Sequence, residues 1–448
     1  MDLTELSRDL PRSSSKISDF PPEIITKIFK AIPYWPSDNR RRTLASLCRV
    51  SSYFASLARP LLYNSLTVHI DVNDLRFMTF VAETVLPAKR CTVHVKSLRV
   101  TFEKEEFPEY QALRLILHSL KLDTLKIKAS KPIPLFYTLL WPQPNLKRLI
   151  LPDLLLDEKM MSSCFPLLPE LEVFKGRIWV DERNGLEEPE QEEETSNDRP
   201  GPLSTPPTFK LRELYLAWGP RQDAFDYAVQ SSYDTLSHLT LTMNDWRAAM
   251  NLSKLVALES LVFVANSTNV SMFGGDPQCL LALRECMKTV KTLPSLRTLT
   301  FEGTLQWTKF PTFAKDILSS LPESLEELSI GNWNYPFFDY ELFRQQVPGL
   351  PRLRKLSLLE TEGFENYPSF ELHHDLLTQH RVQIVIQSGY TARTNRYLGN
   401  ELDPFGTSSE VDSDMEEEEG EVEDDSQTSA DEGDGNGLGN GEVRTFVL

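Results

Sequence analysis

The sequence lacks the features of a membrane-spanning, secreted or disulfide-linked protein. No apolar run in its 448 residues approaches the roughly 18 residues that a membrane-spanning helix needs. The N-terminal residues MDLTELSRDLPRSSSK contain no apolar core of a signal peptide. The five cysteines are odd in number and irregularly spaced, which argues against a disulfide framework. We therefore expect a chain of the cytoplasm or the nucleus, with no membrane partner.

Motifs that carry chemistry are also missing. The sequence has no G-x-x-x-x-G-K-[ST] or G-x-G-x-x-G loop for a nucleotide phosphate, no H-E-x-x-H, no C-x-x-C and no G-x-S-x-G. His373 and His374 are adjacent, so on a helix their side chains would point about 100° apart and could not chelate a metal. Basic residues form no continuous run with interleaved aromatics. We expect a non-catalytic protein with no cofactor, no metal and no nucleic-acid partner.

The net charge of −18 comes mainly from two acidic segments. Residues 401–448 contain 17 acids and one base, and residues 181–199 contain nine acids and two bases. The rest of the chain has 44 bases and 39 acids, so the body of the protein is slightly basic.

Both acidic segments are poor in apolar residues, so they cannot bury enough surface to offset the entropy of ordering. We expect a disordered tail over 400–448, an acidic, Pro-rich insert over 181–208 and a disordered N-terminus over 1–16. The acidic segments either attract a basic partner or only keep the chain in solution, and the sequence leaves both alternatives open.

Residues 17–66 predict a module of three short helices. Proline is tolerated in the first turn of a helix, where the amide donors have no intrahelical acceptor, so Pro21 and Pro22 suit a helix start. An apolar stripe follows at Ile24, Ile25, Ile28 and Phe29. About 45 residues are too few to enclose a core of their own. We therefore expect another surface, from this chain or from another protein, to cover the apolar faces.

The segments FPPEIITKIF (20–29), LCRVSSYF (47–54) and LARPLLY (57–63) resemble an F-box, particularly its fungal form. The resemblance implies that the module binds a Skp-type adaptor and, through it, a cullin. It implies the following adaptor-facing or supporting positions: Pro21, Pro22, Ile24, Ile28, Phe29, Leu47, Cys48 and Val50. The alternative is that these residues pack against the following domain as an N-terminal cap.

Residues 67–399 repeat the pattern L-x-x-L-x-L, with other apolar residues replacing some leucines. The ten copies start at residues 95, 122, 146, 171, 211, 236, 258, 296, 325 and 353, and a final strand is predicted at Val382–Ile386. Most of the spacings are similar to those of leucine-rich repeats, in which each copy forms one short strand that its neighbours cover. We predict an α/β repeat fold, an irregular leucine-rich-repeat solenoid, over an ordinary parallel α/β domain.

Only Asn244 and Asn266 occupy the position of the asparagine that usually follows this pattern, so other groups must satisfy the backbone at the turns. The solenoid offers a long concave surface for a protein substrate. Residues between the repeated leucines are basic in the first half of this surface, which suits an acidic partner or the chain's own acidic segments.

Two functions are consistent with these patterns. The first is the substrate-recognition subunit of a Skp–cullin–F-box ubiquitin ligase, with the module on the adaptor and the solenoid on a protein substrate. The second is a non-ligase leucine-rich-repeat protein whose acidic tail binds histones or another basic partner.

Overall fold

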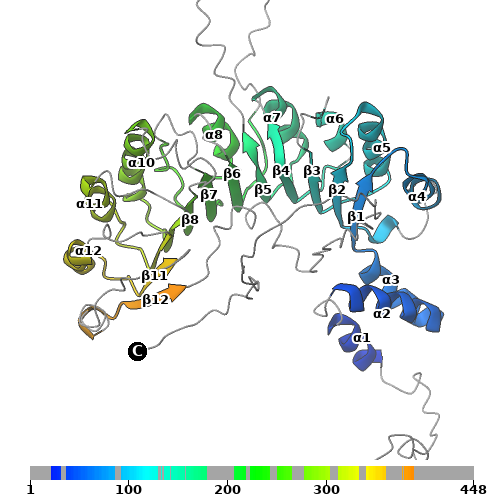
Figure 1. Ribbon diagram of the computed structural model, residues 1–448, viewed down its shortest axis with the longest axis horizontal. Helices are drawn as coiled ribbons and strands as arrows, with labels where there is room; N and C mark the ends of the chain where they lie inside the picture. Colours follow the sequence, from blue (N-terminus) through cyan, green and yellow to red (C-terminus); the bar gives the residue numbers. More distant parts are fainter. Residues whose placement is uncertain are drawn as a thin grey trace, which may run out of the picture.

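The computed structural model describes residues 22–31, 37–85, 92–129, 133, 136–141, 143–156, 158–178, 206–217, 222–242, 250–264, 277–302, 311–331, 340–359, 376 and 378–387. These residues form an arch of parallel strands with helices along its outer side, and a separate helical module lies at its N-terminal end (Figure 1). The segments expected to be disordered at 1–16 and 400–448, and nearly all of the insert at 181–208, lie outside these ranges.

One sheet of 12 parallel strands runs through the arch, and the strands follow one another in chain order from β1 to β12. The strands are β1 Ser65–Ile70, β2 Ser97–Phe102, β3 Thr124–Lys128, β4 Arg148–Leu156, β5 Val173–Ile178, β6 Glu213–Ala217, β7 His238–Thr242, β8 Ser260–Val264, β9 Thr298–Glu302, β10 Glu327–Gly331, β11 Lys355–Leu359 and β12 Gln383–Gln387. Sequential order throughout is the topology of a solenoid, so the α/β repeat fold is confirmed.

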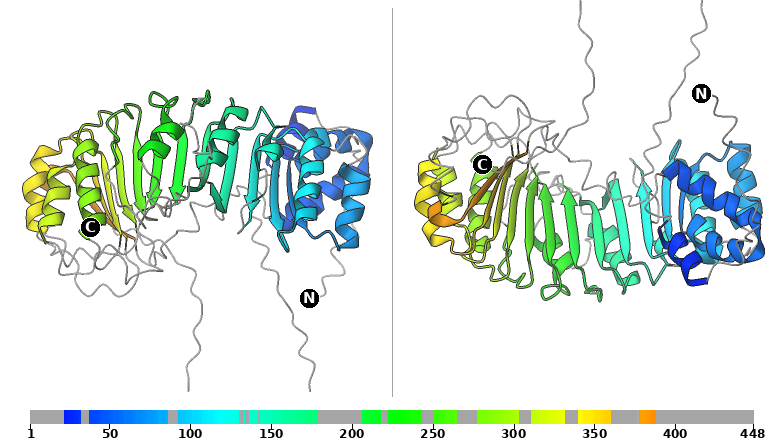
Figure 2. Two further views of the ribbon diagram at one scale, coloured as in Figure 1. Left: turned by 90° about the horizontal axis from the view of Figure 1, so that it is seen from above. Right: turned by 90° about the horizontal axis from the view of Figure 1, so that it is seen from below.

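Helices connect the strands and cover the convex face of the sheet (Figures 1 and 2). In the N-terminal module they are α1 Pro22–Ala31, α2 Ser37–Val50 and α3 Ser52–Leu62. Along the arch they are α4 Leu75–Phe80, the π-helix η3 Val81–Val85, α5 Phe107–His118, α6 Phe136–Leu140, α7 Glu158–Cys164, α8 Gln222–Val229, α10 Pro277–Val290, α11 Pro311–Ser319 and α12 Tyr340–Gln346, with 3-10 turns at Thr92–His94, Phe165–Leu167 and Val347–Gly349.

The repeat pattern sets the strand register. The second leucine of each copy lies opposite that of the next, as Leu98 does opposite Leu125 and Leu125 opposite Leu149. The same alignment holds for all ten copies and continues to Ile384 in β12. The strand β1 precedes the first copy and pairs Leu66 with Leu98. Strand β1 crosses the boundary that was expected between the helical module, which ends at residue 66, and the repeats, which start at residue 67. The sheet therefore begins directly after the helical module.

A backbone ladder joins the start of each strand to the next. The carbonyl of Lys96 accepts hydrogen bonds from the amides of Asp123 (2.8 Å) and Thr124 (3.0 Å). The carbonyl of Asp123 does the same for Lys147 and Arg148, and this pattern runs from Asn64 to Glu326 before a single bond links Arg354 to Gln383. This ladder lies at the strand starts, whereas the asparagine position of the pattern follows the strand, so the ladder satisfies a different set of backbone groups. Asn244 and Asn266 lie outside the described residues.

Individual side chains satisfy the remaining backbone groups between repeats. Gln143, which is 1% exposed, accepts from the amide of Leu122 (3.0 Å) and donates to the carbonyls of Leu117 (2.6 Å) and Leu120 (3.0 Å). In other repeats this role falls to hydroxyls, as in Ser232, whose oxygen accepts from the amide of Leu211 at 2.8 Å. The side chain that makes these hydrogen bonds therefore differs from repeat to repeat.

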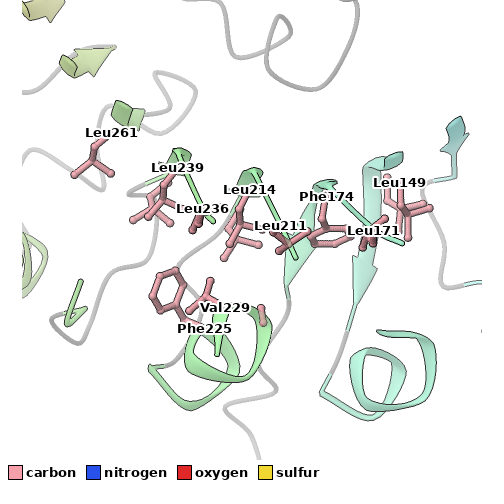
Figure 3. Close-up of a cluster of buried hydrophobic side chains, with 14 of the residues drawn as sticks. Leu149, Leu171, Phe174, Leu211, Leu214, Phe225, Val229, Leu236, Leu239 and Leu261 are labelled. Carbon is pink, nitrogen blue, oxygen red and sulfur yellow. The ribbon is translucent and has the colours of Figure 1, made fainter. Parts of the chain in front are cut away.

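The core lies between the sheet and the helices (Figure 3). Alternate strand residues point inward, so Leu149, Leu214 and Leu239 belong to one row of the core, and Leu214 and Leu239 lie above Phe225 and Val229 of α8. Phe174 replaces leucine in β5, and its ring contacts Phe165 edge-on with centroids 5.2 Å apart. A Cβ at Gly176 would lie 2.7 Å from Cζ of this ring. The larger residue at 174 thus requires glycine two positions on.

The close approach at Gly176 predicts coupled substitutions. Gly176→Ala should lower the free energy of unfolding by about 1–3 kcal/mol, because the new methyl group collides with the buried Phe174 ring. Adding Phe174→Leu should make the alanine much less costly than it is beside phenylalanine. Urea unfolding of the two single variants and the double variant measures the coupling, and strictly additive effects would contradict the steric explanation.

The buried amide of Gln143 gives a second prediction. Gln143→Ala should destabilise the protein by about 3 kcal/mol, because it leaves one amide and two carbonyls without their partner. The control Gln111→Ala changes an exposed glutamine in α5 and should stay within about 0.5 kcal/mol of the unchanged protein. Equal effects of both substitutions in thermal unfolding would show that Gln143 does not support the turn.

Candidate protein-binding surfaces

The helical module has a small apolar core of its own. Ile25, Phe29, Leu44, Phe54 and Ala58 form a buried cluster distinct from the core of the solenoid. Phe29 and Phe54 stack with ring centroids 5.8 Å apart. Our expectation that this segment could not enclose a core is therefore wrong. The two stacked rings are the largest side chains of this core, and Ala58 is fully buried in the same cluster.

The structure divides the sequence-predicted site residues into two groups. Ile24, Ile28 and Val50 are 44%, 53% and 56% exposed. Phe29 is buried in the module core, and Leu47 and Cys48 are half-buried against it. These three therefore support the module from inside, as the resemblance allows. Pro22 is the first residue of α1, whereas Pro21 lies outside the described residues.

Tyr53 is an exposed apolar residue that the sequence analysis missed. Its side chain is 44% exposed in the first turn of α3, next to the buried Phe54. Ser51 caps this helix by accepting a hydrogen bond from the amide of Phe54 at 3.1 Å. Its exposure could be predicted from the sequence, because Tyr53 directly precedes Phe54 and so lies outside the buried helical stripe of Phe54 and Ala58. With Val50 it places two apolar side chains at the corner between α2 and α3.

The module is joined to the arch without a linker. Tyr63 ends α3 and packs against the solenoid core, and the carbonyl of Asn64 accepts from the amides of Lys96 (2.9 Å) and Ser97 (3.0 Å). The first step of the backbone ladder thus starts at the end of the module. Figures 1 and 2 show the module at the N-terminal end of the arch, on the side toward which the arch opens.

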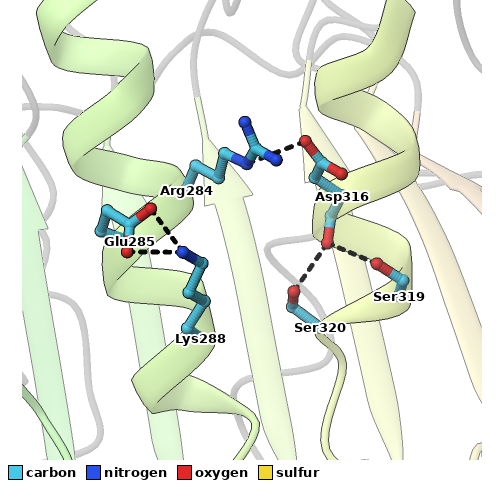
Figure 4. A network of polar contacts seen from close by, with 6 residues as sticks. All are labelled: Arg284, Glu285, Lys288, Asp316, Ser319 and Ser320. Atoms are coloured by element: carbon cyan, nitrogen blue, oxygen red, sulfur yellow. Dashed lines mark hydrogen bonds and ion pairs between the residues drawn. The ribbon is translucent and has the colours of Figure 1, made fainter.

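On the convex surface over α10 and α11, the charged side chains form ion pairs and hydrogen bonds within the chain (Figure 4). Arg284 Nε lies 3.0 Å from Asp316 Oδ2 and links the two helices, while Lys288 Nζ lies 2.6 Å from Glu285 Oε1. The hydroxyls of Ser319 and Ser320 donate to the carbonyl of Asp316. These charges already have partners, so this part of the convex face is a weak candidate for binding.

The middle of the concave face contains buried polar side chains. Lys175 in β5 is only 3% exposed and lies 2.6 Å from Glu213 in β6. The neighbouring Tyr215 is 2% exposed, and its burial, with Glu302 adding to the effect and Arg177 opposing it, raises the pKa of its hydroxyl above the ordinary range. Lys126 of β3, one of the basic residues between the repeated leucines, is also buried, at 8% exposure.

No group of three potential metal ligands occurs among the residues that the structure describes. Within the same residues no helix has both the length and the apolar character needed to cross a bilayer.

No protein-family model matches this sequence, and no curated protein matches it. Among solved structures, the chain is similar to the leucine-rich repeat-containing protein LegL7 from Legionella pneumophila, with 13% sequence identity and a TM-score of 0.37. The similarity covers 77% of this chain and 95% of that one. The assignment of repeats to this chain rests on its own strand register, and the F-box resemblance stays a prediction.

We expect the two ion pairs of the concave face to contribute differently to the free energy of unfolding. Glu213→Ala should destabilise the protein by about 1–3 kcal/mol, because it leaves the ammonium group of the buried Lys175 without this carboxylate. Glu327→Ala breaks the pair with Lys355 (2.7 Å), in which both side chains are about one-third exposed, and should cost less than about 1 kcal/mol. Denaturant unfolding compares them, and an equal or larger loss for Glu327→Ala would contradict the role of burial.

Proposed function

We propose that this protein is the substrate-recognition subunit of a Skp–cullin–F-box ubiquitin ligase. The helical module binds a Skp-type adaptor, and the concave face of the solenoid holds a protein substrate. The observation that carries the proposal is the set of exposed apolar residues on a module whose own core is already closed. Ile24 and Ile28 lie four residues apart on α1 and therefore share a helical face, which suits burial by a second protein.

The separation of the two cores supports this function over an N-terminal cap. A cap would bury Ile24 and Ile28 against the first repeats, whereas both remain about half exposed and the module core is distinct from that of the solenoid. The direct junction at Tyr63 and Asn64 also fits a recruiting subunit. Only two residues separate α3 from β1, so the adaptor and the substrate surface would lie close to one another along the chain.

Catalysis in such a complex is a matter of position. The chain supplies no reacting group. It holds a substrate lysine close to the ubiquitin-conjugating enzyme that the cullin carries, which raises the effective concentration of the lysine. The concave face opens to the same side as the module, so substrate and adaptor would lie on one side of the arch (Figure 1).

The test is retention of a purified Skp-type adaptor by the full chain. Ile24→Asp with Ile28→Asp should reduce retention at least about tenfold, because two charges replace the apolar contact. The matched control, Leu115→Asp with Leu281→Asp, changes two similarly exposed leucines on α5 and α10 and should retain the adaptor fully. Phe29 is unsuitable for this test, since its loss would open the module core.

Failure of the unchanged chain to retain the adaptor would refute the proposal, as would full retention by the Ile24 and Ile28 variant. Circular dichroism and thermal unfolding of both variants show whether the module stays folded. Salt-sensitive retention of histones that disappears on removing residues 408–448, without adaptor binding, would favour the alternative of an acidic histone-binding protein.

A further inference from the structure

The strand β12 forms one edge of the sheet, at the opposite end of the arch from the helical module (Figure 1). Among the residues that the structure describes, β12 pairs with β11 alone, in register from Gln383 to Gln387. Ile384 in the middle of the strand is buried in the core of the solenoid. The edge strand is therefore held in place by its own repeat, and its outer side is already shaped for a further strand.

The alternation of a parallel ladder identifies the main-chain groups at this edge. The amide of Gln383 donates to the carbonyl of Arg354 on the side of β11, at 2.8 Å. Successive residues of a strand direct their amides and carbonyls to opposite sides, so those of Ile384 and Ile386 point away from β11. These groups can form the hydrogen bonds of one more parallel or antiparallel strand.

The sequence of β12 contains nothing that blocks such pairing. Natural edge strands usually contain charged residues or proline, which prevent another strand from adding to the sheet. The strand Gln383–Gln387 has neither, and its three central residues are all β-branched. An uncharged apolar edge of this kind favours the addition of an extended segment.

We propose that residues 443–448 of the same chain add to β12 as a further strand. This segment, VRTFVL, contains two valines, a threonine and a phenylalanine, the residue types that strands prefer. The preceding residues 406–442 are rich in acids, serine and glycine, which suit a flexible linker and are depleted in strands. Within the acidic tail, 443–448 is therefore the segment best suited to pair with the edge.

The length of the linker permits this contact and favours β12 over the other edge strand, β1. The 55 residues 388–442 separate the segment from Gln387, and a flexible chain of this length has a root-mean-square end-to-end distance of about 40 Å. The edge at β1 lies eleven strand spacings away, which is about 50 Å along the sheet. Because the linker starts at β12, the effective concentration of the segment is highest there.

This pairing would close residues 388–442 into a loop that begins and ends at β12. The 14 acids between residues 410 and 434 would then be tethered at both ends to the part of the arch opposite the helical module. The inference goes beyond the proposed function and does not rest on it, since it concerns only the sheet edge and the tail.

The test is hydrogen exchange of single amides in the full chain. Thr445→Pro with Phe446→Pro should speed the exchange of the Ile384 and Ile386 amides at least about tenfold, because proline removes one donor from each alternating set of the added strand. The amides of Gln383 and Val385, which face β11, should change little. The matched control, Gln427→Pro with Thr428→Pro in the acidic run, should leave all four amides unchanged.

A peptide supplied separately gives an independent measurement. Ending the chain at residue 440 should speed the exchange of the Ile384 and Ile386 amides by the same factor. The octapeptide GEVRTFVL, residues 441–448, should restore slow exchange at about 5 mM, near the effective concentration that a flexible tether supplies. The same peptide with proline in place of its threonine and phenylalanine should not restore it.

Equal exchange of the Ile384 and Ile386 amides in the full chain and in the Thr445 and Phe446 variant would overturn the proposal. Slow exchange in both would mean that another segment, such as the residues directly after β12, covers the edge. Light scattering should give the mass of one chain. Slow exchange that requires the mass of two chains would assign the edge to a second copy, and the proposal would be wrong. The adaptor is absent throughout, so these results are separate from the adaptor test.

Discussion

The architecture depends on one repeated contact, a backbone carbonyl that accepts two amides from the following repeat. The carbonyls that make this contact run from Asn64 to Glu326, and each one aligns the start of one strand with the start of the next. The second leucine of each copy therefore lies opposite the second leucine of the following copy. Inward side chains then stack into a continuous core, where each buried leucine contributes about 1.5–3 kcal/mol. Because carbonyl and amide belong to the main chain, this ladder accepts any residue type except proline at its donor positions.

Much of the arch could be predicted from the sequence, because the determinants are local and repeated. Each L-x-x-L-x-L copy has its three apolar positions within six residues, and all ten copies lie in register. The strand β1 was missed because Tyr63 stands in place of the first leucine. Its ring nevertheless packs against the core as that leucine would. Short helices such as α6 and α8 have too few turns to show a clear apolar period.

The helical module shows where sequence reasoning fails. Its apolar residues could be identified, but their division into core and surface depends on how three helices cross. Ile28 and Phe29 are adjacent in sequence, yet one is half exposed and the other is buried against Phe54. A contact between residues 25 positions apart decides this difference. Likewise, Lys175 is buried beside Glu213 of the following strand, a contact between repeats that no single strand carries by itself.

A ladder that uses only main-chain atoms tolerates change in the number of its units. Neighbouring strands lie in register although the second leucines of successive copies are separated by as few as 22 residues, from Leu239 to Leu261, and as many as 40, from Phe174 to Leu214. Duplicating or deleting one copy would leave the same donors facing the same acceptors on both sides. Gene rearrangement can therefore lengthen or shorten the arch while the ladder continues, and only the side-chain contacts between neighbours, such as those of Gln143, have to form anew. The length of the inner surface can change in this way during evolution.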